Sequence, residues 1–135
     1  IVFWSATGNT ETMANCIAEG AGTNGTLVPC AEMTPAKLAE FDVVAFGCPA
    51  MGAEQLEESE FEPMFAALEG SLNGKKIALF GSYGWGDGQW MRDWVQRAQD
   101  DGAQLFSEEG LICNETPDDD VQAACRKLGA DLVAW

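Results

Sequence analysis

Short apolar runs alternate with segments of helical periodicity along the whole chain, and this alternation restricts the possible folds more than any other feature. Apolar runs of four to six residues, bounded by Gly, Asn or Pro, are typical of strands buried in a sheet. A fifth strand is expected in two pieces, because polar residues interrupt it. The expected strands are residues 1–4, 26–30, 42–47, 76–81 and, for the fifth, 103–106 with 111–113.

The segments between these strands carry apolar side chains three and four residues apart, which predicts helices with one buried face. Thr34-Pro35 and Thr116-Pro117 add the pattern of a capping residue followed by Pro in the first turn. Strands alternating with helices predict an α/β fold with an open, five-stranded parallel sheet and helices on both faces. The expected helices are residues 10–21, 34–40, 61–72, 90–98 and 121–132.

The charge balance excludes several classes of function. The chain has 135 residues, which we expect to form a single domain, and its 22 acidic and 7 basic side chains give a net charge of −15. Such a chain repels nucleic acids and anionic membranes. It contains no His, which excludes the Ser-His-Asp and Cys-His catalytic arrangements and zinc sites with His ligands.

Five scattered cysteines indicate a reduced protein. No two of them stand at Cys-x-x-Cys spacing, which argues against a local iron–sulfur or zinc site. We expect buried thiols in a cytoplasmic protein. No apolar run reaches the length of a membrane span, and no signal segment opens the chain. Because it begins in an apolar run without Met, we expect a few residues to precede Ile1.

The loop after the first expected strand, residues 5–10, carries three hydroxyls, one amide and one glycine just before a helix. Backbone N–H groups at a helix start, helped by hydroxyls, form a site for a small terminal phosphate. The first basic residue of the chain is Lys37, so only neutral donors and the helix dipole would hold that phosphate. A capped helix start without a ligand explains the same hydroxyls.

Two further loops present large side chains at the ends of the third and fourth expected strands. Met51 stands beside Gly52, and Trp85 stands between two glycines. Neither lies on a helical stripe, whereas Trp90 and Trp94 do and are expected in the core. A planar ring can lie between a thioether and an indole. A phosphate at one end and a planar ring at the other is the outline of flavin mononucleotide (FMN).

Four segments of this chain together resemble the short-chain flavodoxins of anaerobic, clostridial-like bacteria. They are Ser-x-Thr-Gly-Asn-Thr at 5–10, Gly-Cys-Pro-Ala-Met-Gly at 47–52, and the stretches 56–63 and 80–88, in the same order over essentially the whole chain. The resemblance implies sheet order 2-1-3-4-5, one noncovalent FMN and no stand-alone enzyme activity. It further implies a low-potential carrier that moves single electrons between redox enzymes through the semiquinone/hydroquinone couple.

The resemblance also assigns the cofactor contacts. Met51 would cover the inner face of the flavin ring and Trp85 the outer face, and Glu54 would accept a hydrogen bond from flavin N3–H. Backbone groups of Gly84 and Gly86 would lie near the pyrimidine edge, with Asn114 near the ribityl chain. The phosphate would be bound by the side chains of Ser5, Thr7, Asn9 and Thr10 and the backbone of Ala6 and Gly8. The set is completed by Pro49, Ala50, Gly52, Ala53, Ser82 and Tyr83.

One position departs from the family pattern. In the family the peptide after the Met-Gly step flips on reduction, and here that peptide joins Gly52 to Ala53. If the flipped turn needs a positive φ at Ala53, the Ala side chain costs roughly 1 kcal/mol more than Gly. That corresponds to on the order of 40 mV for one electron, and hence to a slightly less stabilised semiquinone.

The charges around these loops bear on the reduction potential. None of the seven basic residues lies within the three loops. Each nearby acid would disfavour an anionic reduced ring by about 1 kcal/mol before screening, which lowers the second reduction potential. The same acids are also expected to form a solvated face that attracts redox partners with basic docking surfaces. These acids are Glu54, Glu57, Glu58, Glu60, Glu62 and Asp87. We expect the carrier itself to be a monomer.

Three other functions stay open at this stage. The first is an FMN quinone reductase that uses a nicotinamide cofactor, although the chain is short and lacks a basic site for a pyridine nucleotide. The second is a signalling or anion-binding module, although Ser5 and Thr7 stand where a receiver domain needs acids. The third is a domain of a larger flavoprotein.

Overall fold

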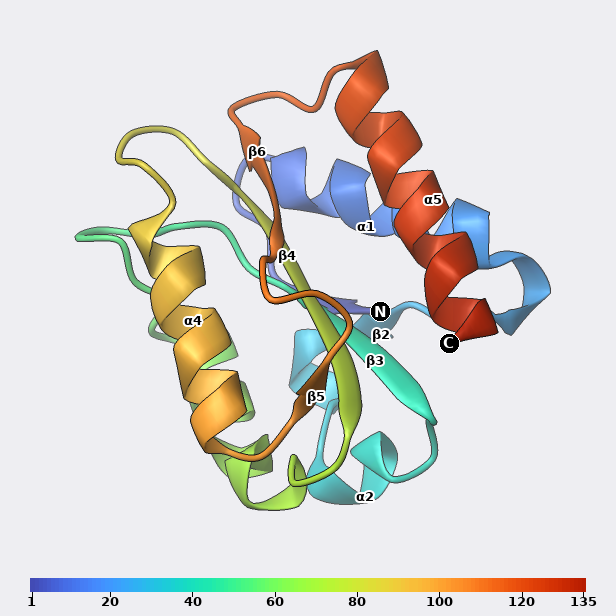
Figure 1. The fold of residues 1–135 in the computed structure, drawn as a ribbon. Coiled ribbons are helices and arrows are strands. Elements are labelled where there is room, and N and C mark those ends of the chain that lie inside the picture. Colours follow the sequence, from blue (N-terminus) through green and yellow to red (C-terminus); the bar gives the residue numbers. More distant parts are fainter.

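A parallel sheet between two helical layers makes up the computed structural model, which describes residues 1–135 (Figure 1). Every strand pair is parallel, and the order β2-β1-β3-β4-β5 confirms the order that the resemblance implies. The strands are β1 (Val2–Phe3), β2 (Val28–Pro29), β3 (Val43–Gly47), β4 (Lys76–Tyr83), β5 (Gln104–Leu105) and β6 (Leu111–Asn114).

The last position of the sheet is filled by two strands instead of one. β5 pairs with the first two residues of β4, and β6 pairs with its last four. Residues 107–110 leave the sheet between them, because the segment Ser-Glu-Glu-Gly offers no apolar side chain to bury. The interruption expected from the sequence is therefore confirmed, and it divides the fifth strand into β5 and β6.

The helices cover both faces of the sheet, with α1 and α5 on one face and α3 and α4 on the other (Figure 1). Thr34 caps α2 with its side chain as expected, whereas the expected cap Thr116 is wrong: Asp118 caps α5, and Pro117 precedes the helix. The expected third helix is shorter than its apolar pattern, because a 3₁₀ turn, η3 (Glu69–Ser71), continues it. The helices are α1 (Asn9–Ala21), α2 (Pro35–Leu38), α3 (Phe61–Leu68), α4 (Gln89–Asp100) and α5 (Asp119–Ala134), with 3₁₀ turns also at η1 (Gly22–Asn24) and η2 (Cys30–Glu32).

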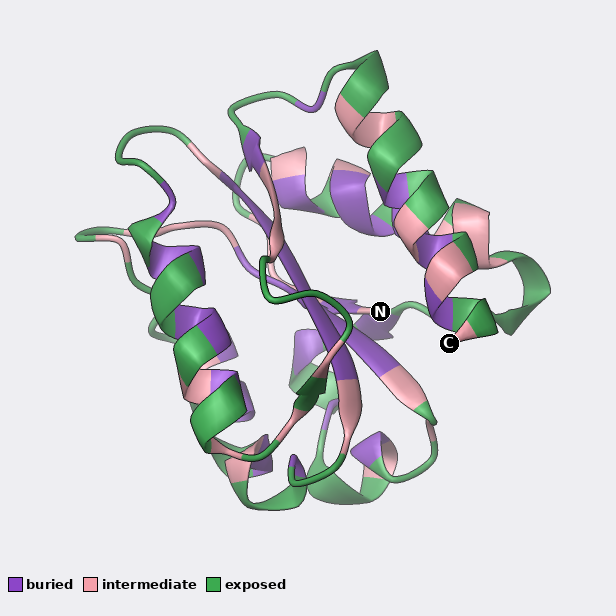
Figure 2. Ribbon diagram, in the orientation of Figure 1, coloured by how far each residue is buried: buried purple, intermediate pink, exposed green.

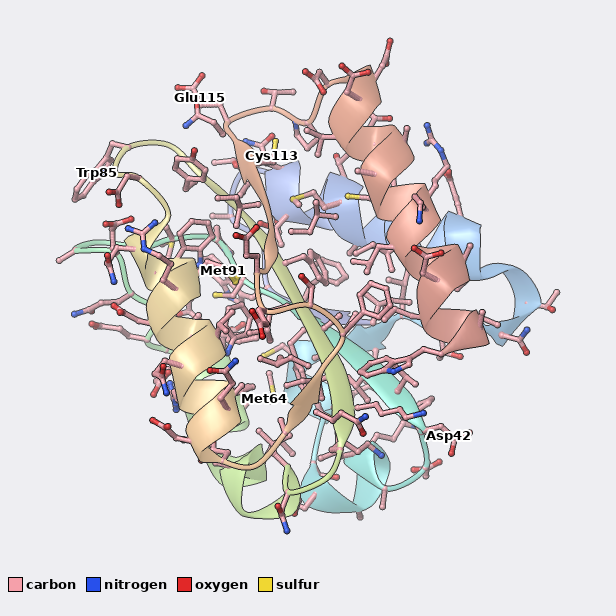
Figure 3. The ribbon with its side chains drawn as sticks, viewed as in Figure 1. Asp42, Met64, Trp85, Met91, Cys113 and Glu115 are labelled. Atoms are coloured by element: carbon pink, nitrogen blue, oxygen red, sulfur yellow. The ribbon has the colours of Figure 1, made fainter.

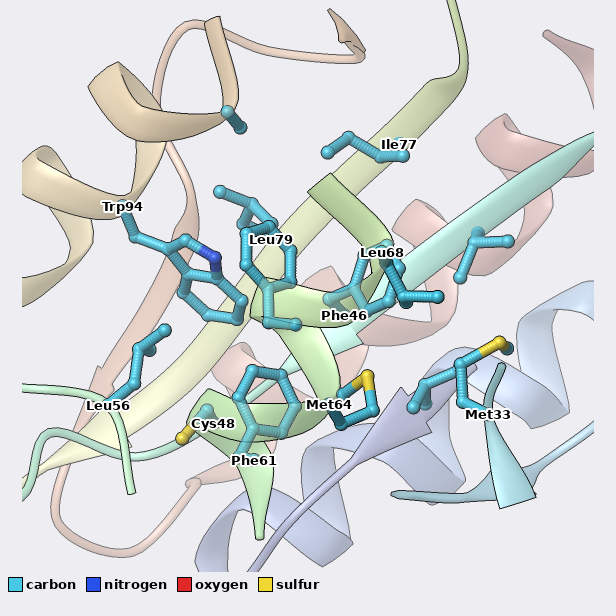
Figure 4. Close-up of a cluster of buried hydrophobic side chains, with 14 of the residues drawn as sticks. Met33, Phe46, Cys48, Leu56, Phe61, Met64, Leu68, Ile77, Leu79 and Trp94 are labelled. Atoms are coloured by element: carbon cyan, nitrogen blue, oxygen red, sulfur yellow. The ribbon is translucent and has the colours of Figure 1, made fainter. Parts of the chain in front are cut away.

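Alternation along the central strands produces two cores. Phe46 and Leu79 point to the α3/α4 side, while Ala45 and Phe80 point to the α1/α5 side. Figure 2 shows the buried residues concentrated on β3, β4 and the inner faces of the helices. Aliphatic, sulfur-containing and aromatic side chains together fill the α3/α4 core (Figure 4), where Trp94 is fully buried as expected from its helical stripe.

The described chain has five free cysteines, all of them buried, as the sequence predicts. Burial raises the pKa of Cys48 to about 12, so this thiol stays protonated at neutral pH. None of the helices combines the length and the apolar character needed to cross a membrane.

Candidate functional site

Three loops leave the carboxyl end of the sheet and gather at one end of the molecule (Figure 1). They connect β1 to α1, β3 to α3 and β4 to α4. β1 lies between β2 and β3, so the strand order reverses at this point, where open α/β sheets bind their ligands. The geometry thus brings together the three loops that the sequence singles out.

The first loop is shaped by Gly8, which has φ 95° and forms the start of α1. Ser5 Oγ accepts hydrogen bonds from the N–H groups of Gly8 (3.2 Å) and Glu11 (3.3 Å). The N–H groups of Asn9 and Thr10 lie too early in the helix for an intrahelical acceptor. No Lys or Arg side chain bonds to this loop, so it offers an anion only neutral donors and the dipole of α1.

Thr10 turns inward from this loop and meets the end of β4. Its side chain is 1% exposed, and its Oγ1 lies 3.0 Å from Ser82 Oγ. The Ser82 N–H also donates to Thr10 Oγ1, at 3.3 Å. The side chains of Thr7 and Asn9 make no hydrogen bond within the chain. The first loop is therefore tied to the strand that leads into the third loop.

The second loop contains a closed turn. Met51 and Gln55 exchange backbone hydrogen bonds of 2.8 Å in both directions. Left-handed backbone falls on Gly52, with φ 52°, and on Glu54, with φ 53°. Ala53 does not have a positive φ in this turn. The strain considered for Ala53 is therefore absent from the turn in this structure, while a non-glycine residue, Glu54, holds a left-handed conformation.

Glu54 joins the second loop to the third. Its Oε1 accepts a hydrogen bond of 3.0 Å from the Gln89 N–H, the first N–H group of α4. The carboxylate also lies against Gly86: a Cβ atom at that position would be only 2.7 Å from Glu54 Oε1. Gly86 has φ 91°, a left-handed conformation that favours glycine, and a side chain there would also push the Glu54 carboxylate aside.

The third loop raises Trp85 at its tip, where the side chain is 70% exposed (Figure 3). Asn114, from β6, supports this loop by donating to the carbonyls of Tyr83 (3.4 Å) and Gly84 (3.3 Å). Trp85 is the most exposed of the four large apolar side chains at the surface, and hydrogen bonds hold the loop that carries it.

Arg92 reaches back from α4 to the third loop, a contact that the sequence did not reveal. Its guanidinium donates to the Asp87 carbonyl (3.1 Å) and carboxylate (2.9 Å) and to Gln89 Oε1 (2.8 Å). Asp87 is therefore paired with a cation. In the sequence, the only sign of this contact is that Asp87 and Arg92 stand five residues apart across the start of a helix.

The acids of residues 54–62 differ in environment. Glu57 is 5% exposed and accepts hydrogen bonds from the Glu60 and Phe61 N–H groups, at 2.9 and 2.8 Å, and from the hydroxyl and N–H of Ser59. Burial alone would raise its pKa, but these bonds, led by that from the Ser59 hydroxyl, hold the pKa below its ordinary value. The interpretation of Glu57 as part of a solvated face is wrong: it caps α3.

Two further acids of this group are also engaged. Glu60 accepts from Trp4 Nε1 at 3.0 Å, and Glu62 pairs with Arg97 at 2.8 Å. Glu58 is exposed and makes no ion pair or hydrogen bond. A groove of about 360 Å³ runs beside these acids along α4. Its lining includes Glu54, Glu58, Glu62, Asp93 and Arg97.

The largest cavity, of about 490 Å³, lies at the opposite end of the sheet. Its lining includes the start of β1, the start of β3 and the end of α5. It is remote from the three loops, and its lining includes the carboxylates of Glu40 and Asp42 but no Lys or Arg side chain. The chemistry of the chain points to the loops and not to this cavity.

The three loops fit an elongated ligand with an anion at one end and a planar ring at the other. The open space at Gly8, where a Cβ would meet nothing within 4 Å, leaves the helix start accessible. The exposed Trp85 and the half-buried Met51 supply flat and polarisable surfaces for a ring. This donor set fits FMN, with the phosphate at the first loop.

Comparisons with known proteins agree with this geometry. The family described as Flavodoxin matches residues 1–128. A flavodoxin of Megasphaera elsdenii is 47% identical over 96% of this chain and 93% of that protein, and one of Clostridium beijerinckii is 42% identical over 98% and 97%. The solution structure of two-electron reduced Megasphaera elsdenii flavodoxin superimposes with a TM-score of 0.86 at 44% identity, covering 99% of this chain and 97% of that one.

Proposed function

This chain belongs to the flavodoxin family, and from that premise we propose which of its residues hold the cofactor and receive a partner. The protein binds FMN and carries single electrons at low potential to and from partner proteins; it is not a stand-alone enzyme. Bound FMN supplies a ring that is reduced one electron at a time. One observation supports the assignment most strongly. The first loop, which offers an anion only neutral donors, and the loops that carry Met51 and Trp85 all lie where the strand order reverses.

The phosphate is assigned to the first loop. The side chains of Ser5, Thr7, Asn9 and Thr10 and the backbone of Ala6 and Gly8 form its donors. Support comes from the start of α1, whose first N–H groups lack intrahelical acceptors, and from the free side chains of Thr7 and Asn9. The helix dipole adds about 0.5 of an elementary charge at this point, in the absence of any cation.

The ring is assigned to the second and third loops. Met51 and Trp85 face it from two sides, with residues 49–54 and 82–86 around its edges. Glu54 accepts from the N3–H edge of the ring, and the Gln89 N–H holds this carboxylate in place. Asn114 acts on the ribityl side by bracing the carbonyls of Tyr83 and Gly84.

The charges of the chain set the potential of the bound ring. Glu54 and Glu58 form no ion pair and lie near the second loop, Glu57 is buried and hydrogen-bonded, and Glu62 is paired with Arg97. Acids near the ring disfavour added negative charge and lower the potential of the second one-electron step. Arg97 offsets the charge of Glu62, whereas the charges of Glu54, Glu57 and Glu58 are offset by no cation.

The groove beside α4 is assigned to redox partners. Its carboxylates outnumber its single guanidinium, so its field attracts a basic surface. Electrons enter and leave at the exposed Trp85 end of the same region. We propose a monomeric, cytoplasmic carrier formed by one FMN-binding domain over residues 1–135, in keeping with its five free thiols.

A visible spectrum recorded during stepwise dithionite reduction of the FMN-reconstituted protein tests the function. Flavin bands that pass through a long-wavelength absorbance before bleaching are expected of a one-electron carrier. Rapid bleaching by NADH or NADPH alone would instead identify the quinone-reductase alternative. A protein that takes up no FMN would remove the proposal and leave only the fold.

A further inference from the structure

The side-chain hydroxyls of Thr10 and Ser82 are buried against each other. Only one of their two O–H groups can donate to the other oxygen. Their side chains are 1% and 5% exposed, and the two oxygens lie 3.0 Å apart. The Ser82 N–H donates to Thr10 Oγ1 as well. A hydroxyl donates one hydrogen bond and accepts two. Neither oxygen has another partner within the chain, so one of the two O–H groups is left without an acceptor.

The arrangement of hydrogens decides which group is left free. If Thr10 donates to Ser82, the idle hydrogen sits on Ser82, buried at the end of β4. If Ser82 donates to Thr10, its O–H and N–H fill both acceptor positions of Thr10 Oγ1. The idle hydrogen then belongs to Thr10, beside the first N–H groups of α1. Only this second arrangement presents a donor to an anion in the first loop.

We propose that Ser82 is a positioning residue that directs the Thr10 hydroxyl hydrogen to the phosphate of FMN. This inference rests on the proposed function, because it takes the first loop as the phosphate site. Ser82 stands on the strand that leads to Trp85, yet it acts at the phosphate end of the cofactor. A buried O–H that gains an anionic acceptor makes one of the stronger classes of hydrogen bond.

Riboflavin lacks the phosphate of FMN, so comparing the two ligands isolates this effect. In Ser82→Ala, Thr10 keeps its hydroxyl but loses the second donor that polarises it, and FMN should bind two- to fivefold more weakly. Thr10→Val should weaken FMN binding by roughly ten- to one hundredfold. Any loss of riboflavin affinity in Ser82→Ala should be smaller than the loss of FMN affinity. Flavin fluorescence quenching measures both dissociation constants.

The double variant tests whether Ser82 acts through Thr10. In the Thr10→Val background, Ser82→Ala should have no further effect on FMN affinity, because the hydroxyl that it positions is gone. Ser71→Ala, an exposed serine in η3 without a hydrogen bond, is the matched control and should leave both affinities unchanged. Equal weakening of riboflavin and FMN by Ser82→Ala, or an undiminished effect in the double variant, would overturn the proposal.

A measurement on the unaltered protein covers the case in which a variant fails to fold. In the FMN-loaded protein, the Thr10 hydroxyl hydrogen should show an NMR scalar coupling to the FMN phosphorus. FMN binding with no such coupling, or a coupling on the Ser82 hydroxyl instead, contradicts the inference alone. A wild-type chain that binds no FMN contradicts the proposed function itself.

Discussion

The first loop and the acid-rich segment of residues 54–62 achieve their chemistry in opposite ways. In the first loop, a left-handed glycine and a helix start present neutral donors, and each acts through local backbone geometry. In the acid-rich segment, Glu57 caps α3 through bonds to residues two to four positions further on, Glu62 pairs with the distant Arg97, and Glu58 stays a free surface charge. A site formed by local backbone geometry can be recognised in the sequence, whereas an ion pair such as Glu62 with Arg97 depends on how distant elements pack.

The sharpest test of this contrast compares two neighbouring glutamates. Glu57→Ala should lower the free energy of unfolding by about 3 kcal/mol, because it leaves buried N–H groups at the start of α3 without an acceptor. Glu58→Ala should change it by less than about 0.5 kcal/mol. Urea unfolding of both variants measures the difference. Similar losses would mean that the two acids are not divided as described.

The pKa of Glu57 adds a pH signature to that comparison. Since its pKa is lowered in the folded protein, its stabilising contribution is complete above the ordinary value of 4.5. That contribution disappears as the pH falls through the lowered pKa. The stability gap between wild type and Glu57→Ala should therefore narrow in acid, while a gap that stays constant would assign the effect to packing.

A substitution that disturbs the backbone of the first loop should weaken FMN binding. Gly8→Ala places a side chain at φ 95°, which costs about 1–2 kcal/mol, so FMN should bind roughly tenfold more weakly. Gly70→Ala, at an open position with an ordinary φ, is the matched control. Fluorescence titration with FMN measures both. An unchanged affinity in Gly8→Ala would show that the left-handed conformation is not needed.

A second acid with a shifted pKa, Asp101, lies at the C-terminal end of α4. Burial, together with Glu69, raises its pKa to about 6, so the folded chain loses stability as the pH rises from 3.8 through about 6. Asp101→Asn should therefore be more stable than wild type at pH 7.5, by up to about 1 kcal/mol, with the gain absent near pH 4. Asp100→Asn serves as control. A gain that is independent of pH would argue against titration of Asp101.

Arg92 should give the smallest effect, because it and Asp87 are exposed, at 56% and 77% of their side chains. Arg92→Gln frees the Asp87 charge and should lower the second one-electron potential by on the order of 20 mV at low salt. The shift should vanish at high salt. Arg126→Gln, on the opposite helical layer, is the control. A shift that survives high salt would point to loop displacement instead of charge.

The sequence predicts the elements well where one local pattern dominates. Continuous apolar runs identify β3 and β4, and the helical stripe identifies the buried face of α4. The split between β5 and β6 is also visible, since residues 107–110 have no apolar side chain. The sheet order follows from the resemblance and not from these patterns, because periodicity carries no information on which strands are neighbours.

The candidate site is only partly predictable for the same reason. The cradle at Gly8 depends on residues next to one another in the sequence. The Thr10–Ser82 pair joins positions 72 residues apart, and the Glu54–Gln89 bond joins positions 35 apart. No local pattern distinguishes Glu57 from Glu58, since burial of the first depends on how α3 packs against the sheet. Side-chain identity alone therefore overestimates how many of these acids are free surface charges.

The dependence of FMN affinity on ionic strength tests most directly whether neutral groups alone hold the phosphate in this acidic chain. Titrations at about 0.05 M and 0.5 M NaCl compare strong and weak screening of charge. Because no Lys or Arg bonds to the first loop and the net charge is −15, the affinity should stay constant or increase with salt. A tenfold loss of affinity at high salt would reveal a cationic phosphate site and contradict the account.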